Sequence, residues 1–245
     1  MGVTHHGRTY RLDLADPTLR EWTAKVLHAS AEDGIVLDRS AFYPGGGGQP
    51  PDHGVLLWQG VQTRIVGTRK SDDLYLLPAE GDPLPPVDTE VTGAVEDDRR
   101  TKLMRTHSGL HVLCGVVFRD FGARVTGGSM EPAEARMDFN LPEVPPDFKA
   151  RLEELVNAEV VADRKVVTQV LGRDEALALP DIIRTQSNLI PADEQEIRIV
   201  DIVGLDTQAD GGTHVASTAQ IGRLQVVKVE SKGKANRRVR MRLSD

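Results

Sequence analysis

Residues 97–121 read DDRRTKLMRTHSGLHVLCGVVFRDF, and this stretch decides the fold of the second half of the chain. Its apolar residues recur at helical spacing in one stripe, made of Leu103, Leu110, Leu113, Val117 and Phe121. This spacing predicts a long amphipathic helix, and Gly122 offers the stop that helices commonly take just past their last turn. His107 and His111 stand four residues apart on this helix and therefore share one face.

A second pair at the same spacing, Asp210 and His214, frames the sequence Asp-Gly-Gly-Thr-His directly after a predicted buried strand. Gly211 and Gly212 are expected to let a tight loop turn both side chains toward one point. Brought together, the two pairs would complete a tetrahedral site of the kind that zinc takes, and a carboxylate binds zinc at ~2.0–2.2 Å, much as imidazole does. Being harder than a thiolate, the carboxylate also broadens the metal choice toward manganese or iron. Zinc acidifies water or polarises a carbonyl, so the pattern predicts a metal-dependent hydrolase.

The alternative for the histidines is plain packing at a helix surface, which is the commoner role of a single histidine. The second pair is what favours a metal site. Cys114 lies one turn beyond His111 and is expected to be a buried small thiol, since that is the usual setting of a free cysteine.

The bulk composition indicates a folded protein of one or two domains. The chain has 245 residues, of which 39% are hydrophobic and 27% charged, as in ordinary globular proteins. No apolar run approaches the ~20 residues of a membrane helix, and the N-terminal residues lack a hydrophobic signal core. One cysteine excludes an internal disulfide framework. These features predict a cytoplasmic protein without membrane contact.

Two domains are expected, residues 1–90 and 91–245, because the pattern changes after the breaker-rich stretch 81–86 (Gly-Asp-Pro-Leu-Pro-Pro). The first domain has short apolar runs separated by Gly, Pro and Asp, which is typical of a small β-barrel or sandwich. One helix is predicted within it, at Thr18–His28, from the spacing of Leu19, Trp22 and Val26.

The second domain is predicted to be α+β. Besides the helix at 97–121, the apolar stripe of residues 146–163 predicts a second helix. Strands are expected at 166–171 and 197–203, and a hairpin at 224–230 and 237–243.

Two further features carry alternative interpretations. The loop at Gly45–Gln49 is a phosphate cradle of backbone N–H groups, a Gly-Gly-Gln tip like that of peptide release factors, or a flexible turn. The C-terminal hairpin is rich in Lys and Arg although the net charge of the chain is −7. Those cations either block aggregation at an edge strand or contact a phosphate backbone, which would make binding salt-sensitive. The residues singled out for RNA contact are Lys232, Lys234, Arg237 and Arg238.

The chain resembles the free-standing alanyl-tRNA editing proteins, in their medium-length form, and the matching editing domain of alanyl-tRNA synthetase. The resemblance rests on His107-x-x-x-His111, on Gly211-Gly212-Thr213-His214, on the glycine-rich stretch 42–50, and on segments 125–129, 136–139 and 228–238. Asp210 stands where that family usually has cysteine.

This resemblance implies an α+β fold: an N-terminal small β-barrel domain followed by an editing domain of the tRNA synthetase second-additional-domain type. It implies a trans-editing deacylase for mischarged tRNA(Ala), acting on the acceptor end that carries serine or glycine, with one zinc ion per chain and no protein partner. It places the glycine-rich loop at the domain interface, with Gly46, Gly47, Gly48 and Gln49 facing the substrate.

Discrimination between serine and alanine is expected to rest on a hydrogen bond to the substrate hydroxyl, with Thr126 as the candidate. The metal either activates water or holds the amino group and positions the ester, and Asp210 is the ligand expected to move or to act as a base. The alternative function is an inactive tRNA-binding module with a degenerate metal site. A third interpretation is a metallohydrolase that acts on a small ester or amide.

Overall fold

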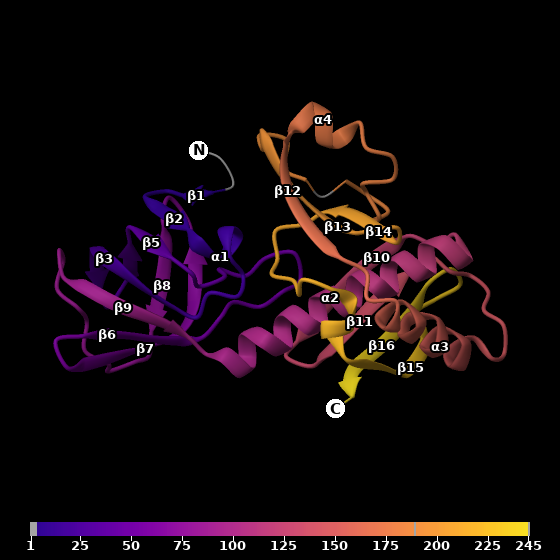
Figure 1. Cartoon of the computed structure of the whole chain (residues 1–245), viewed down its shortest axis with the longest axis horizontal. Helices are drawn as coiled ribbons and strands as arrows, with labels where there is room; N and C mark the ends of the chain where they lie inside the picture. Colours follow the sequence, from indigo (N-terminus) through magenta and orange to yellow (C-terminus); the bar gives the residue numbers. More distant parts are fainter. Residues whose placement is uncertain (1–3, 189, 245) are drawn as a thin grey trace. The chain divides into compact units, whose positions relative to one another are not determined.

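The computed structural model describes residues 4–188 and 190–244. The chain divides into two compact units, residues 1–101 and 102–245. Figure 1 shows the first unit in indigo to magenta and the second in magenta to yellow. The predicted fold class is confirmed: the protein is α+β, with an N-terminal barrel followed by an α+β unit.

The first unit is built around a closed barrel with the strand order β3-β4-β8-β7-β6-β9. Its strands are β3 (Glu21–Ser30), β4 (Gly34–Leu37), β6 (Gly54–Trp58), β7 (Val61–Lys70), β8 (Leu74–Pro78) and β9 (Glu90–Val95). A small sheet of β1 (His5–His6), β2 (Thr9–Arg11) and β5 (Arg39–Ser40) and a short helix α1 (Leu12–Ala15) complete it. Strand β9 pairs with β3 and β6, so the barrel continues past residue 90.

The helix predicted at Thr18–His28 is wrong, because these residues enter strand β3. Trp22, Ala24 and Val26 are buried while the residues between them are exposed, which is the period of two of a half-buried strand. Leu19, Trp22 and Val26 fit a helical spacing only when Ala24 is left out of the apolar set. In the structure Trp22 packs edge-on against Phe42 inside the barrel.

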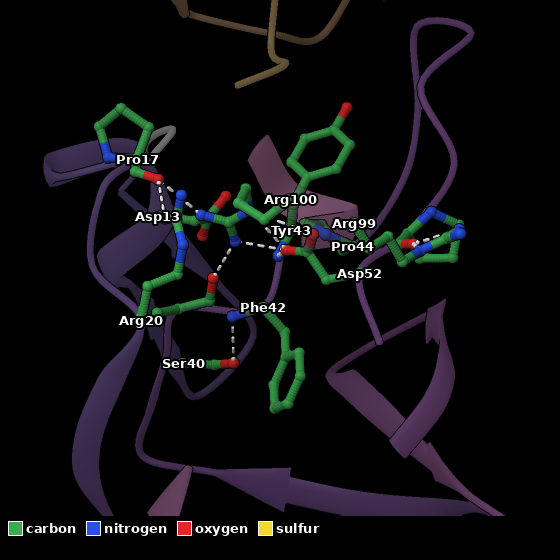
Figure 2. Close-up of polar contacts among 12 residues, drawn as sticks. Asp13, Pro17, Arg20, Ser40, Phe42, Tyr43, Pro44, Asp52, Arg99 and Arg100 are labelled. Atoms are coloured by element: carbon green, nitrogen blue, oxygen red, sulfur yellow. Dashed lines mark hydrogen bonds and ion pairs between the residues drawn. The ribbon is translucent and has the colours of Figure 1, made fainter. Parts of the chain in front are cut away.

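A buried ion pair ties the glycine-rich segment of the barrel unit to the first turn of helix α2 (Asp97–Phe121). Arg100 and Asp52 are both fully buried, and the Arg100 Nε donates to both oxygens of Asp52 at 3.1 and 3.0 Å. The same guanidinium donates to the carbonyl of Pro17 (Figure 2), at 2.8 Å, and to the carbonyl of Ala41, at 2.6 Å. Asp52 also accepts the backbone N–H of Tyr43 at 2.6 Å. A buried carboxylate with this many donors is well compensated, so the segment that leads to the glycines is held in place.

The second unit has two sheets and two main helices. Its larger sheet has the order β10-β11-β16-β15, from β10 (Val125–Glu131), β11 (Glu134–Phe139), β15 (Arg223–Ser231) and β16 (Arg237–Ser244). The smaller sheet has the order β12-β13-β14, from β12 (Val166–Gly172), β13 (Glu196–Ile202) and β14 (Asp206–Ala209). Helix α3 is Phe148–Val161, α4 is Arg173–Leu177, and a 3₁₀ turn covers Thr218–Ile221. The predicted helices, strands and C-terminal hairpin of this unit are confirmed.

Two glycines allow helix α2 to be packed closely on both sides. A Cβ at Gly109 would lie 2.9 Å from the Met241 side chain, and one at Gly115 would lie 2.8 Å from that of Leu205. Glycine costs ~1 kcal/mol relative to alanine inside a helix. Here the close approach of the sheets to the buried helix explains its presence. Among the described residues, no helix is both long and apolar enough to cross a membrane.

Candidate metal centre

Four side chains from two distant segments meet in the second unit. His107 and His111 come from helix α2, and Asp210 and His214 from the segment after strand β14. One ligand atom from each residue lies within 4.8 Å of the others. The Asp210 carboxylate is the common point: its Oδ2 lies 3.4 Å from His107 Nε2 and 3.9 Å from His111 Nε2, and its Oδ1 lies 3.1 Å from His214 Nε2. The same nitrogen of each imidazole therefore faces one centre.

The loop that carries Asp210 is shaped by hydrogen bonds. The backbone N–H of Gly212 donates to Asp210 Oδ1 at 2.6 Å, which closes a turn of the Asx type. Arg198, buried on β13, donates to the carbonyls of Asp210 and Gly212 at 3.0 and 2.9 Å. Neither Gly211 nor Gly212 adopts a positive φ. The expectation that glycine freedom makes this turn is therefore corrected: the carboxylate and the arginine make it.

Two of the imidazoles are also held from behind. His111 Nδ1 lies 3.1 Å from Asp206 Oδ2, and His214 Nδ1 lies 3.2 Å from Ser108 Oγ. Ser108 is fully buried and also accepts the backbone N–H of Val215 at 3.1 Å. Outer partners of this kind fix the tautomer and ring orientation of metal-binding histidines.

The electrostatics of the cluster favour an ionised carboxylate among imidazoles. Burial alone would raise the pKa of Asp210, but the charge and hydrogen bonds of the surrounding histidines hold that pKa well below its usual range. Burial, followed by the charge of His107, lowers the pKa of His214 well below its ordinary value. Burial also works to lower the pKa of His111, yet the hydrogen bonds and charges of Asp206 and Asp210 outweigh it and raise that pKa to about 9.

The residues present fit a zinc ion on three observations. The donors are three imidazole nitrogens and one carboxylate oxygen, all of them zinc ligands. The three histidines are buried, with side-chain exposures of 5%, 6% and 2%, and Asp210 is partly buried, with 12% of its side chain exposed. All four converge on one point, since one ligand atom from each residue lies within 4.8 Å of the others. Cys114 is buried and burial raises the pKa of its thiol, in keeping with an inert packed cysteine.

The other predicted site residues lie elsewhere in the fold. Thr126 is half-buried on β10, and its hydroxyl donates to Asn236 Oδ1 at 3.2 Å. The glycine-rich loop belongs to the barrel unit, where Gly46 and Gln49 exchange backbone hydrogen bonds of 3.0 and 2.9 Å. Gly46, Gly47 and Gly48 have φ values of 133°, 58° and 90°, which only glycine adopts readily. These three glycines are exposed, whereas Gln49 is buried.

The four predicted RNA-contact cations differ in setting. Lys232 and Lys234 lie exposed in the turn between β15 and β16. Arg238 is bound by Asp138, with two hydrogen bonds of 2.7 Å, and Arg237 donates to the carbonyls of Pro142 and Asn236. Of these four described cations, both arginines are held by hydrogen bonds, whereas neither lysine side chain makes a hydrogen bond or an ion pair.

Sequence reasoning missed Asp206, Ser108 and Arg198, the residues that hold the cluster in shape. A signal for Asp206 was present, since it alternates with Gln208 and Asp210 and so shares their face of an extended strand. Ser108 adjoins His107 on the helix. Nothing in the local pattern marks Arg198, because it acts on the backbone of a loop from the neighbouring strand.

Comparisons with known proteins agree with this architecture. Residues 197–240 match the family described as the threonyl and alanyl tRNA synthetase second additional domain, and residues 17–99 match the class II (A) tRNA synthetases. The chain is 35% identical over 238 residues to the alanyl-tRNA editing protein AlaX-M of Saccharolobus solfataricus, covering 94% of this chain and 97% of that protein. The AlaX-M of Methanosarcina barkeri is 31% identical over 242 residues, which is 97% of this chain and all of that protein.

Alanine–tRNA ligases match as well, but only in part of their length. The ligase of Pyrobaculum neutrophilum is 37% identical over 230 residues, which cover 91% of this chain and 25% of the ligase. The chain thus spans about a quarter of the ligases that it matches.

Proposed function

The chain belongs to the family of the alanyl-tRNA editing proteins, and on that basis we propose that it is a trans-editing hydrolase that deacylates mischarged tRNA(Ala). Its substrate is the 3′ aminoacyl ester of Ser-tRNA(Ala), and of Gly-tRNA(Ala) as a second candidate. The cofactor is one zinc ion per chain, held by His107, His111, Asp210 and His214. The observation that carries this proposal is the convergence of three Nε2 atoms on the Asp210 carboxylate.

The bound metal supplies a Lewis acid, which either acidifies a water molecule or holds the amino group of the substrate. The protein residues orient the metal ligands and shape the approach to the site. His111 and His214 are fixed by the buried Asp206 and Ser108, and Asp210 is the most exposed of the four ligands, at 12% of its side chain. Asp210 therefore lines the side from which water and ester approach. Its Oδ2 is the oxygen that faces His107 and His111, because Oδ1 is already bound by Gly212 and His214.

The choice between serine and alanine is assigned to a hydrogen bond with the substrate hydroxyl. A site that provides such a bond leaves a buried polar group unpaired when alanine enters, which penalises alanine strongly. Thr126 is the proposed partner; its hydroxyl already donates to Asn236 and keeps acceptor capacity for a substrate O–H.

Contact with the tRNA is assigned to two features. Lys232 and Lys234 are exposed cations suited to phosphate groups. The exposed residues Gly46–Gly48 form the second candidate surface, next to the buried Gln49.

The experiment that tests this function separates it from that of an inactive tRNA-binding module. Zinc content of the purified protein is measured by elemental analysis, and binding and hydrolysis of seryl-tRNA(Ala) are measured on the same preparation. About one zinc per chain together with hydrolysis is expected, and a His107→Ala/His111→Ala variant should lose both. Tight tRNA binding without zinc and without hydrolysis, even after zinc, manganese or iron has been supplied, would favour the binding module. Hydrolysis of simple esters that survives Lys232→Ala/Lys234→Ala would favour a small-molecule hydrolase.

A further inference from the structure

A second buried layer of charge lies behind His111, on the side away from Asp210. Asp206 on β14 is 2% exposed, and its Oδ2 lies 3.1 Å from His111 Nδ1. The same oxygen accepts a hydrogen bond of 2.6 Å from Gln208 Nε2. Asp206 and Gln208 are two residues apart on the strand, so they present their side chains to the same face. The carboxylate is thus aimed at the imidazole nitrogen that does not face the cluster.

The second oxygen of this carboxylate is bound by a buried arginine. Arg184 is 9% exposed, and its Nε donates to Asp206 Oδ1 at 3.0 Å. Its guanidinium carbon lies 3.9 Å from the centre of the Phe118 ring, on the same helix as His111. Its Nη1 is buried without a hydrogen-bond partner. A buried, partly unsatisfied arginine costs free energy, so its retention calls for a role beyond simple packing.

Helix α2 makes room for this layer. At Gly115 a Cβ would lie 3.0 Å from the Asp206 Cβ, in addition to the clash with Leu205. Gly115 follows His111 by one helical turn, so any larger side chain there would push β14 away from the imidazole. The close approach of Asp206 to His111 is therefore built into the sequence of the helix.

We propose that Asp206, with Arg184 as its countercharge, is a positioning residue that fixes the ring of His111 for metal binding. An ionised carboxylate only accepts hydrogen bonds, so it requires the proton of a neutral His111 to sit on Nδ1. The lone pair is then on Nε2, the atom that faces Asp210 and the proposed metal. This inference rests on the proposed function, because it needs the four-residue cluster to hold a metal ion.

The test is metal affinity in Asp206→Asn, measured with zinc alone against a chromophoric chelator. The NH2 group of the new amide must face one of two partners. If it faces Arg184, two N–H donors oppose each other; if it faces His111, it donates to Nδ1 and so favours the tautomer with its proton on Nε2. Zinc affinity is expected to fall roughly 10–100-fold, the usual cost of losing an outer partner. With cobalt as the probe, the visible absorption bands should shift or weaken, since they report ligand geometry.

Asp201→Asn is the matched control: Asp201 is on the adjacent strand β13 and accepts a hydrogen bond from Thr207, not from the cluster. It should leave both readouts unchanged.

A double variant separates positioning from mere structural support. Asp206→Leu leaves no acceptor for the Nδ1 proton of His111 and leaves the buried charge of Arg184 without its countercharge, so it is expected to lower the melting temperature. Adding Arg184→Met removes that charge while keeping a long side chain over Phe118, so the melting temperature should recover. The positioning role predicts that zinc affinity stays low in the double variant. Recovery of zinc affinity together with stability would overturn it.

The failures of the two proposals are distinguishable. Wild-type protein that binds neither zinc nor cobalt would refute the proposed function, and this inference with it. Tight binding by wild-type protein with equal affinity in Asp206→Asn would refute the positioning role alone.

Discussion

Oδ2 of Asp210 lies 3.4 Å from Nε2 of His107, although one residue is on a loop after strand β14 and the other is on helix α2. This contact joins the two halves of the cluster. It also defines what aspartate does at this position: one oxygen is held by the loop and by His214, and the other is turned toward the helix.

Asp210→Ala should abolish stoichiometric zinc binding and deacylation, because it removes one of four donors and the contact that orients the loop. The loss in zinc affinity should exceed the ~10–100-fold typical of an outer partner. Asp210→Cys is the informative companion, since a thiolate is also a zinc ligand; it should retain zinc. Competition with a chelator measures both. A full complement of tightly bound zinc in Asp210→Ala would remove Asp210 from the ligand set.

Thr126→Val should reduce selectivity for serine over alanine while leaving zinc content unchanged. The side chain keeps its shape but loses its hydroxyl, and an unmade buried hydrogen bond is worth ~1–3 kcal/mol. Selectivity, measured as the ratio of the two deacylation rates, should fall by roughly 5- to 150-fold. Thr126→Ser retains the hydroxyl and should remain selective. Equal selectivity in Val and wild type would exclude Thr126 from this role.

Lys232→Ala/Lys234→Ala should weaken tRNA binding and make it less salt-dependent. Each lost phosphate contact should reduce the slope of log affinity against log salt by about 0.7–0.9. Lys149→Ala, at an exposed position of helix α3, serves as the control. Arg238→Ala should instead lower thermal stability, since Arg238 is bound by Asp138. An unchanged salt slope in the double lysine variant would argue that these cations only protect the sheet.

Asp82→Asn should destabilise the barrel unit at neutral pH and have less effect in acid. Side-chain and backbone hydrogen bonds from Arg64 lower the pKa of Asp82 to about 2, against about 3.9 in an unfolded chain. A carboxyl with a depressed pKa stabilises the fold fully above the unfolded value, and this contribution is lost as the pH falls from about 4 toward 2. Urea unfolding at pH 7, 5 and 3 measures the difference. A gap between wild type and variant that grows in acid would contradict the assignment.

Much of this architecture could be predicted because its signals are local. Helix α2 has a regular apolar stripe and a glycine after its end, and both histidines of its face could be read from their spacing. The prediction for strand β3 was wrong because Trp22, Ala24 and Val26 fit a strand while Leu19, Trp22 and Val26 fit a helix. The pairing of these residues within the barrel selects the strand. The outer partners were missed for a similar reason. Arg198 and Arg184 act through contacts that the chain makes only after folding, so the residues next to them in the sequence do not indicate these contacts.

Metal-dependent editing is tested most directly by the hydrolysis of serylated against alanylated tRNA(Ala) by the purified protein, with and without a chelator. Rapid loss of serine, sparing of alanine, loss of activity on chelation and the return of activity with zinc are expected. Hydrolysis of neither substrate by zinc-loaded protein, or serine removal that survives complete metal removal, would contradict metal-dependent editing.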